Sequence, residues 1–340
     1  MTASTILQEE RPPPNTDAGV VVVDDDDAHN NSTDSDDDHH DDDDAFDALL
    51  HRGELLRRLR QLELEDEKLR QETLAEENDA NNQQQSDTLK YDSFLQQQVF
   101  YDDYKHVNYR FLDFGPVGDA NQKKDMNPLL IEQDRGIKTK GGHVWDAGVI
   151  LAEHVVHEQA EWKNATLKQQ QQQQQPQRHP RGPVRMVELG SGTGITGLYV
   201  ATALPDDVQM ALTDLPQLVP LMKTNLDHNP HCHANTTAFP LEWGSTTGYG
   251  ANHHYDVILG ADVVAGIYDP VKLAQTIADL CRDEQTLVYL AMNRRNHEII
   301  RTFEAAMRPL FTSLEHRDPV SRNKNPNVTI MVATGKKCNQ

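Results

Sequence analysis

The stretch that decides the fold is Val-Arg-Met-Val-Glu-Leu-Gly-Ser-Gly-Thr-Gly-Ile-Thr-Gly, at residues 184–197. Its first six residues are mostly apolar and β-branched, which predicts a buried strand. Gly190, Gly192 and Gly194 then break the strand, and apolar residues recur at helical spacing from Ile195 onward. A strand, a glycine turn and a helix bring backbone N–H groups and a positive helix end to one spot. The stretch therefore predicts a site for a nucleotide-like cofactor.

Strands and helices alternate on both sides of this turn. Strand patterns at 184–189, 208–213, 236–241, 255–261 and 285–292 are interleaved with helical patterns at 195–203, 215–229, 271–281 and 296–309. Such alternation predicts a parallel sheet covered by helices on both faces. Two last strands, at 313–315 and 328–334, have no helix between them, so we expect an antiparallel hairpin there. The predicted fold class is α/β, with a Rossmann-like seven-stranded sheet.

The acidic charge of the chain is concentrated at one end. The net charge is −22, and residues 1–50 contain 16 acidic residues but one basic residue. Because aspartate runs repel one another and bury nothing, residues 1–44 are predicted to be a disordered acidic tail. A helix with leucines at heptad spacing and a polar linker are expected at 45–90. Residues 91–340 are then one globular domain, with a Gln-rich surface loop at about 168–182.

Composition also limits the partners. The three cysteines, Cys232, Cys281 and Cys338, lack the spacing of a metal site and fit a reduced compartment. No segment has the apolar length of a signal peptide or a membrane span. Negative charge disfavours nucleic acid as a partner. We therefore expect a soluble cytoplasmic protein, with the nucleus as a second location, that binds neither metal, membrane nor nucleic acid and is a monomer by default.

The glycine turn alone leaves two cofactors open. Gly192 to Gly197 match the dinucleotide pattern G-x-G-x-x-G, and Asp214 lies 22 residues beyond Gly192, which suits a nicotinamide or flavin enzyme. However, the loop begins earlier, at Glu188 and Gly190, and the C-terminal hairpin is unlike a dinucleotide fold. The choice of cofactor therefore depends on the residues around the turn.

Five short motifs surround the turn in order. They are Val144-Trp145-Asp146-Ala147, Glu188 to Gly194, Leu212-Thr213-Asp214-Leu215, Leu241-Glu242-Trp243-Gly244 and Ile258-Leu259-Gly260-Ala261-Asp262. In this set the chain resembles the seven-β-strand protein-lysine methyltransferases, and within them the group that modifies chaperones, AAA ATPases and translation elongation factors. The resemblance covers about residues 140–335. It implies S-adenosylmethionine as the cofactor.

The resemblance also implies a set of cofactor-binding residues. The glycine turn lets the backbone approach the ribose and methionine parts closely, and the next strand ends in a carboxylate that suits the ribose hydroxyls. Aromatic faces suit the sulfonium through cation–π attraction. The implied residues are Trp145, Gly190, Ser191, Gly192, Asp214, Trp243 and Ala261. Two alternatives stay open: Asp214 as a helix cap and Trp243 as a core side chain.

The acceptor side departs from the family pattern. Asp262, at the end of the fourth strand, is implied to position the acceptor amine, with capping of the next turn as its alternative role. The family pattern Asp-x-x-Tyr is here Asp262-Val263-Val264-Ala265, so the tyrosine is missing. Tyr268, three residues on, is the predicted substitute and the second catalytic candidate.

The predicted function is S-adenosylmethionine-dependent methylation of a lysine on a non-histone protein, such as an elongation factor or a chaperone. A small-molecule methyltransferase of the same fold is the first alternative. An inactive cofactor-binding adaptor is the second, suggested by Ala265, and an NAD-dependent oxidoreductase is the last.

Overall fold

The computed structural model describes residues 51–62, 64–65, 108–117, 124–134, 140–172, 182–245, 254–294, 296–323 and 325–337. All of them belong to one compact unit, Asp43–Gln340. The predicted acidic tail at 1–44 and most of the predicted linker lie outside the described residues. The domain boundaries drawn from the sequence therefore stay predictions.

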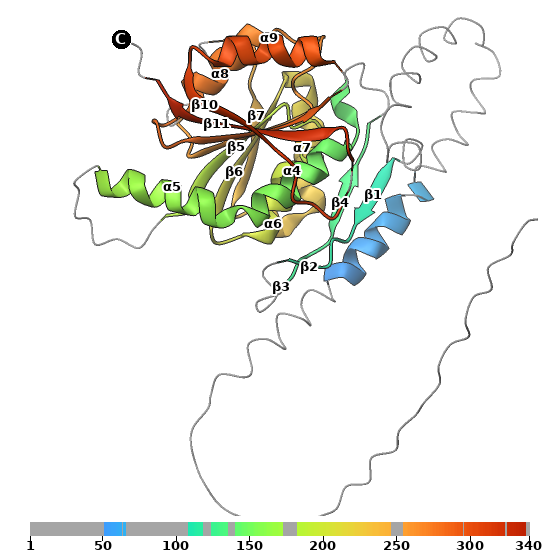
Figure 1. The fold of residues 1–340 in the computed structure, drawn as a ribbon. Helices are drawn as coiled ribbons and strands as arrows, with labels where there is room; N and C mark the ends of the chain where they lie inside the picture. Colours follow the sequence, from blue (N-terminus) through green and yellow to red (C-terminus); the bar gives the residue numbers. More distant parts are fainter. Residues whose placement is uncertain are drawn as a thin grey trace, which may run out of the picture. The chain divides into compact units, whose positions relative to one another are not determined.

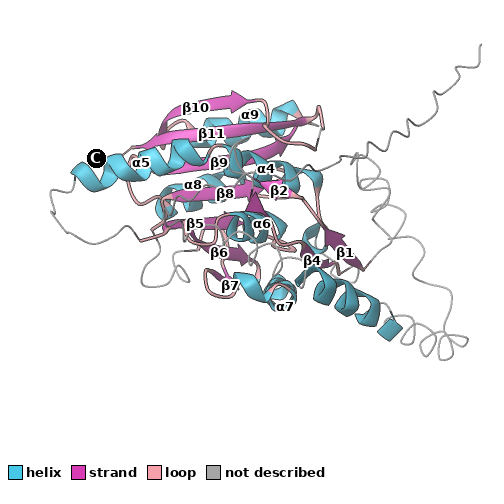
Figure 2. Ribbon diagram, turned by 90° about the horizontal axis from the view of Figure 1, so that it is seen from below, coloured by secondary structure: helices cyan, strands magenta, loops and turns pink. Residues whose placement is uncertain are grey.

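A seven-stranded sheet organises the unit, in the order β10-β11-β9-β8-β5-β6-β7 (Figure 2). The strands are β5 (Val184–Leu189), β6 (Val208–Asp214), β7 (Thr236–Pro240), β8 (Val257–Ala261), β9 (Leu287–Asn293), β10 (Phe311–Arg317) and β11 (Val328–Lys336). Neighbours from β7 to β9 are parallel, whereas β11 is antiparallel to both β9 and β10. The predicted parallel sheet with an antiparallel terminal hairpin is confirmed.

Helices cover both faces because successive strand side chains point to opposite sides. Along β9, Tyr289 and Ala291 join one buried apolar cluster, while Val288 and Leu290 join the other. The first cluster is completed by α4 (Asp146–His157), α6 (Ile195–Ala203) and α7 (Val219–His228); the second by α8 (Pro270–Leu280) and α9 (His297–Met307). Figure 1 shows α8 and α9 on one side of the sheet, with α4 and α6 on the other.

The helices over the second face begin at side-chain caps. Asp269 accepts hydrogen bonds from the N–H groups of Val271 and Lys272, which fixes the start of α8. Asn296 caps α9 in the same way. These caps set the length of the connection from β8 to α8, which borders the site described below.

The segment before the sheet forms short strands and one more helix. β1 (Tyr109–Leu112) pairs with β4 (Leu129–Glu132), and β2 (Pro116–Val117) pairs with β3 (Lys124–Asp125). Helix α5 (Gln159–Gln172) extends into the stretch predicted as a Gln-rich loop. Glutamine is a good helix former, so the helix propagates into the repeat. Residues 168–172 of the predicted loop are therefore helical.

The predicted N-terminal helix is present over residues 51–62 and docks on the same unit. Leu55 on this helix is buried. Arg52 forms an ion pair of 2.7 Å with Asp113, and Arg58 donates a hydrogen bond to the Asp227 carbonyl. Within the described ranges, no helix combines the length and apolarity that crossing a bilayer requires.

Candidate active site

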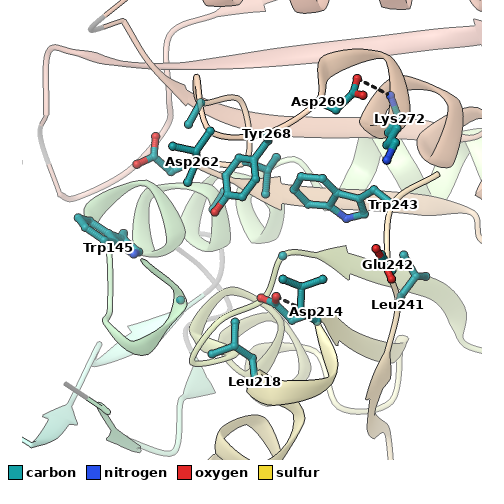
Figure 3. A pocket seen from close by; sticks show the side chains of 17 residues that line it. Trp145, Asp214, Leu218, Leu241, Glu242, Trp243, Asp262, Tyr268, Asp269 and Lys272 are labelled. Atoms are coloured by element: carbon teal, nitrogen blue, oxygen red, sulfur yellow. Dashed lines mark hydrogen bonds between the residues drawn. The ribbon is translucent and has the colours of Figure 1, made fainter. Parts of the chain in front are cut away.

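A cavity of about 570 Å³ lies beside the carboxyl ends of β5, β6 and β8. This volume is in the range of small-molecule and cofactor sites. Seven of the nine predicted site residues line it: Trp145, Gly190, Asp214, Trp243, Ala261, Asp262 and Tyr268. Figure 3 shows their side chains, from distant parts of the chain, around one space. Parallel strands end at a shared edge, which explains the convergence.

The glycine turn is glycine for steric reasons. Gly190 has φ +64°, and a Cβ there would lie 2.8 Å from Val263 and 3.3 Å from the Trp243 ring. Gly192 has φ +55°, and its Cβ would lie 2.5 Å from the Gly141 carbonyl oxygen. Both positions combine a left-handed backbone with a close neighbour. Any side chain at Gly190 would enter the space between Val263 and Trp243.

Ser191 and Gly192 do not line the cavity. The Ser191 hydroxyl donates to the Glu188 carbonyl at 3.1 Å and accepts from the Thr213 N–H at 3.0 Å. It thereby ties β5 to β6 beneath the turn. Gly192 donates its N–H to a carboxylate oxygen of Asp214 at 2.8 Å. These two residues shape the turn, while Gly190 faces the cavity.

Glu188 lies buried beneath the glycine turn. Its carboxylate accepts a hydrogen bond of 3.0 Å from the Gly197 N–H, so it links β5 to the first turn of α6. Burial raises the pKa of Glu188 to about 7, and the hydrogen bond from the Gly197 N–H opposes the rise. Glu188 is thus a structural support of the turn.

Glu188→Gln is expected to remove a pH-dependent loss of stability. The folded-state pKa lies above the ordinary value of 4.5, so the folded protein keeps a proton that the unfolded chain has released. The free energy of unfolding of the parent therefore falls as the pH rises from 4.5 through 7. Relative to the parent, the variant should gain about 3 kcal/mol between roughly pH 5 and pH 8. Urea unfolding across this range measures the difference. Glu284→Gln, at an exposed carboxylate, is the control and should parallel the parent.

Asp214 joins the turn to the end of β6. Its two carboxylate oxygens accept from the N–H groups of Gly192, at 2.8 Å, and Leu215, at 2.7 Å. Burial raises the pKa of Asp214, and these two hydrogen bonds oppose the rise. The N-cap of the following short helix η3 (Pro216–Leu218) is Leu215, so Asp214 is not its cap residue. The carboxylate therefore fixes the turn and also lines the cavity.

Asp262 and Tyr268 lie on the connection from β8 to α8. Asp262 has φ +54°, the single positive value at a non-glycine residue in the described part of the chain. Such a conformation is strained for most residues, and strain of this kind clusters at functional sites. The Tyr268 N–H donates to the Ala265 carbonyl at 3.0 Å, which turns the chain back. Its ring meets the Trp243 ring edge-on, with centroids 5.1 Å apart. In Figure 3, Tyr268 lies between Asp262 and Trp243.

The sequence analysis assigned no role to ten of the residues that line the cavity. Gly141 lines the cavity and packs against Gly192. Lys272, in the first turn of α8, also lines the cavity. The others are Leu215, Leu218, Leu241, Glu242, Val263, Ala265, Ile267 and Asp269. Leu215, Leu241, Glu242, Val263 and Ala265 belong to motifs quoted above, whereas the positions of the others depend on the path of loops. Among the described residues, no three His, Cys, Asp or Glu side chains are arranged to hold a metal ion.

The residues present fit a nucleoside-bearing cofactor. The wall is mostly apolar, a carboxylate stands at the second strand end, and the glycine turn leaves room where a Cβ would intrude. Comparison with known proteins identifies the protein family and with it the kind of cofactor. The profile of the lysine methyltransferase family matches residues 123–308, more than half of the chain. The chain belongs to the lysine methyltransferase family.

Individual relatives of this lysine methyltransferase are distant. It is 26% identical to a UPF0665 family protein of Schizosaccharomyces pombe, over 54% of this chain and 51% of that protein. It is 26% identical to EEF1A lysine methyltransferase 3 of Xenopus tropicalis, over 56% of this chain and 73% of that protein. With the protein-lysine N-methyltransferase EFM6 of Saccharomyces cerevisiae it shares 26% identity, over 62% and 87%. The chain thus spans about half the length of the first relative.

Family membership decides the question left open by the glycine turn. Between a nicotinamide cofactor and S-adenosylmethionine, it assigns S-adenosylmethionine, and it confirms the predicted class of protein-lysine methyltransferase.

Proposed function

We propose that this lysine methyltransferase transfers a methyl group to a lysine of elongation factor 1A or a similar non-histone protein, at the cavity lined by Asp214, Trp243 and Asp262. The observation that carries the proposal is the meeting of a carboxylate-anchored glycine turn and a strained aspartate at one sheet edge. Bound S-adenosylmethionine supplies an activated methyl group that an amine can accept directly. The work left to the protein is binding and alignment.

The cofactor side of the cavity is assigned to four residues. Gly190 leaves space for close approach, and Asp214 offers half-buried carboxylate oxygens suited to hydroxyl groups. The Trp243 ring, held by its edge contact with Tyr268, provides a flat wall. Ala261, at the end of β8, keeps the neighbouring wall small. Hydrogen bonds from hydroxyls to a carboxylate are strong, because the acceptor is charged.

The acceptor side is assigned to Asp262 and Tyr268. A lysine side chain arrives as an ammonium with an ordinary pKa of about 10.4, so it must release a proton to water before its nitrogen can accept a methyl group. Aromatic walls desolvate the amine and lower its pKa. Asp262 attracts and orients the amine at the entrance, without acting as a strong base. Trp145, the residue before α4 and a predicted cofactor-binding residue, lines the same cavity and lies on the same side of the view as Asp262 (Figure 3).

Elongation factor 1A is the first candidate acceptor because one relative is named for its methylation. This acceptor implies a cytoplasmic enzyme. Incubation with tritiated S-adenosylmethionine and a cell lysate, beside purified elongation factor 1A, tests the proposal. We expect a labelled protein band, with the label on lysine. Labelled small molecules instead of protein would favour the small-molecule alternative. Cofactor binding without any label would favour the inactive adaptor, for which Ala265 is the specific reason.

Tyr268→Ala is expected to lower kcat/KM for the acceptor by on the order of tenfold, because the side chain completes the aromatic wall beside Asp262. Tyr268→Phe keeps the ring and should retain most of the activity if packing is the role, and lose it if the hydroxyl is needed. Tritium transfer to elongation factor 1A measures both. If both variants match the parent, Tyr268 does not replace the missing tyrosine at position 265.

A further inference from the structure

A second cavity adjoins the active site behind the connection from β8 to α8. Its volume is about 240 Å³, and it lies between this connection, α8 and α9. The lining residues are Val263, Val264, Ala265, Gly266, Tyr268, Pro270, Leu273, Glu298, Ile299, Thr302 and Phe303. Most are apolar, and Leu273 and Phe303 at its base are fully buried.

The two cavities share a thin wall. Val263, Ala265 and Tyr268 line both of them. Ala265 stands where the family resemblance leads us to expect a tyrosine. Ala265 contributes only a methyl group to the lining of each cavity. The next residue, Gly266, also lacks a large side chain, and a Cβ there would lie 2.9 Å from the Ile299 side chain.

Exposed apolar side chains lie near the second cavity, and one carboxylate, that of Glu298, lines it. Ile267, which lines the first cavity, is 57% exposed, and Val271 in the first turn of α8 is 64% exposed. Exposed Glu298 stands at the mouth, and Asp262 lies on the active-site side of the wall. Exposed apolar residues beside a concave site are typical of an interaction surface. The carboxylates suit a segment that carries a positively charged lysine.

We propose that the second cavity holds one large apolar side chain of the acceptor protein, close in that protein to the lysine that enters the active site. The inference rests on the proposed function, since the two cavities would bind one acceptor segment. The wall from Val263 to Tyr268 then lies between the target lysine and its apolar neighbour. Ala265 becomes a specificity-determining residue, because its small side chain keeps the second cavity open.

Thr302→Phe is the test, because Thr302 lines the second cavity and not the first. The added ring blocks the mouth from the exposed face of α9. With purified elongation factor 1A, or the lysate protein that becomes labelled, KM should rise at least tenfold, as expected for the loss of one buried apolar side chain. The kcat and the Kd for S-adenosylmethionine should stay within about twofold. Arg301→Phe places the same ring one residue away, outside the cavity, and should match the parent.

The outcomes separate the two proposals. If the parent labels no protein, the proposed function fails and the subsite with it. If the parent labels a protein and Thr302→Phe has an unchanged KM, or Arg301→Phe shows the same rise, the subsite alone is overturned. Should Thr302→Phe fail to fold, Thr302→Leu blocks the mouth with a smaller side chain, and an unchanged KM in that variant overturns the subsite equally.

Discussion

Asp214→Ala is expected to weaken the binding of S-adenosylmethionine by more than 100-fold. The carboxylate lines the cavity and is held in place by the N–H groups of Gly192 and Leu215. Two hydrogen bonds from ligand hydroxyls to a charged acceptor contribute about 1.5–3 kcal/mol each. Losing both corresponds to a factor of about 100 or more in Kd. The change also leaves the Gly192 N–H without its acceptor, so the glycine turn loosens.

Calorimetric titration of the purified variants measures this effect. Asp214→Asn keeps one acceptor oxygen and should fall between the parent and the alanine variant. Asp227→Ala removes an exposed carboxylate on α7, away from the cavity, and should bind like the parent. A Kd for Asp214→Ala within threefold of the parent would contradict the assignment of Asp214 to the cofactor.

The sequence predicted the sheet closely because its signals are local. The apolar run, three glycines and helical spacing at residues 184–197 sit next to one another, and β5 and α6 have the predicted bounds. The hairpin of β10 and β11 followed in the same way from the lack of a helix between the strands. Signals carried by neighbouring residues survive in any tertiary context, which explains why the core of the fold was predictable.

The division of labour within the site was not predictable from the sequence. Three turn residues were given one common role, yet Gly190 faces the cavity while Ser191 and Gly192 hold the turn from behind. That difference depends on the approach of Gly141, which is 51 residues away from Gly192 in the sequence. Likewise, the cavity behind Ala265 arises from where α8 and α9 dock. Sequence motifs predict which residues form the site, whereas the packing of distant segments determines the direction in which each residue points.

Asp262→Asn is expected to reduce kcat/KM for the acceptor by on the order of 100-fold, while the Kd for S-adenosylmethionine changes less than about twofold. Asparagine keeps the size of the side chain and tolerates a left-handed backbone as aspartate does, so the geometry of the connection is preserved. What is removed is the charge that attracts and orients the amine, and alignment accounts for much of the barrier in such transfers. Steady-state tritium transfer and calorimetry measure the two quantities separately.

Asp262→Gly separates function from strain at the same position. Glycine adopts φ +54° without cost, so the variant should be more stable than the parent by about 1 kcal/mol in urea unfolding. Its methyl transfer should be as low as that of Asp262→Asn, because both lack the carboxylate. A gain in stability with lost activity means that the fold keeps a strained aspartate here for its carboxylate. Full activity in Asp262→Gly would instead assign Asp262 to the turn alone, which was the alternative role inferred from the sequence.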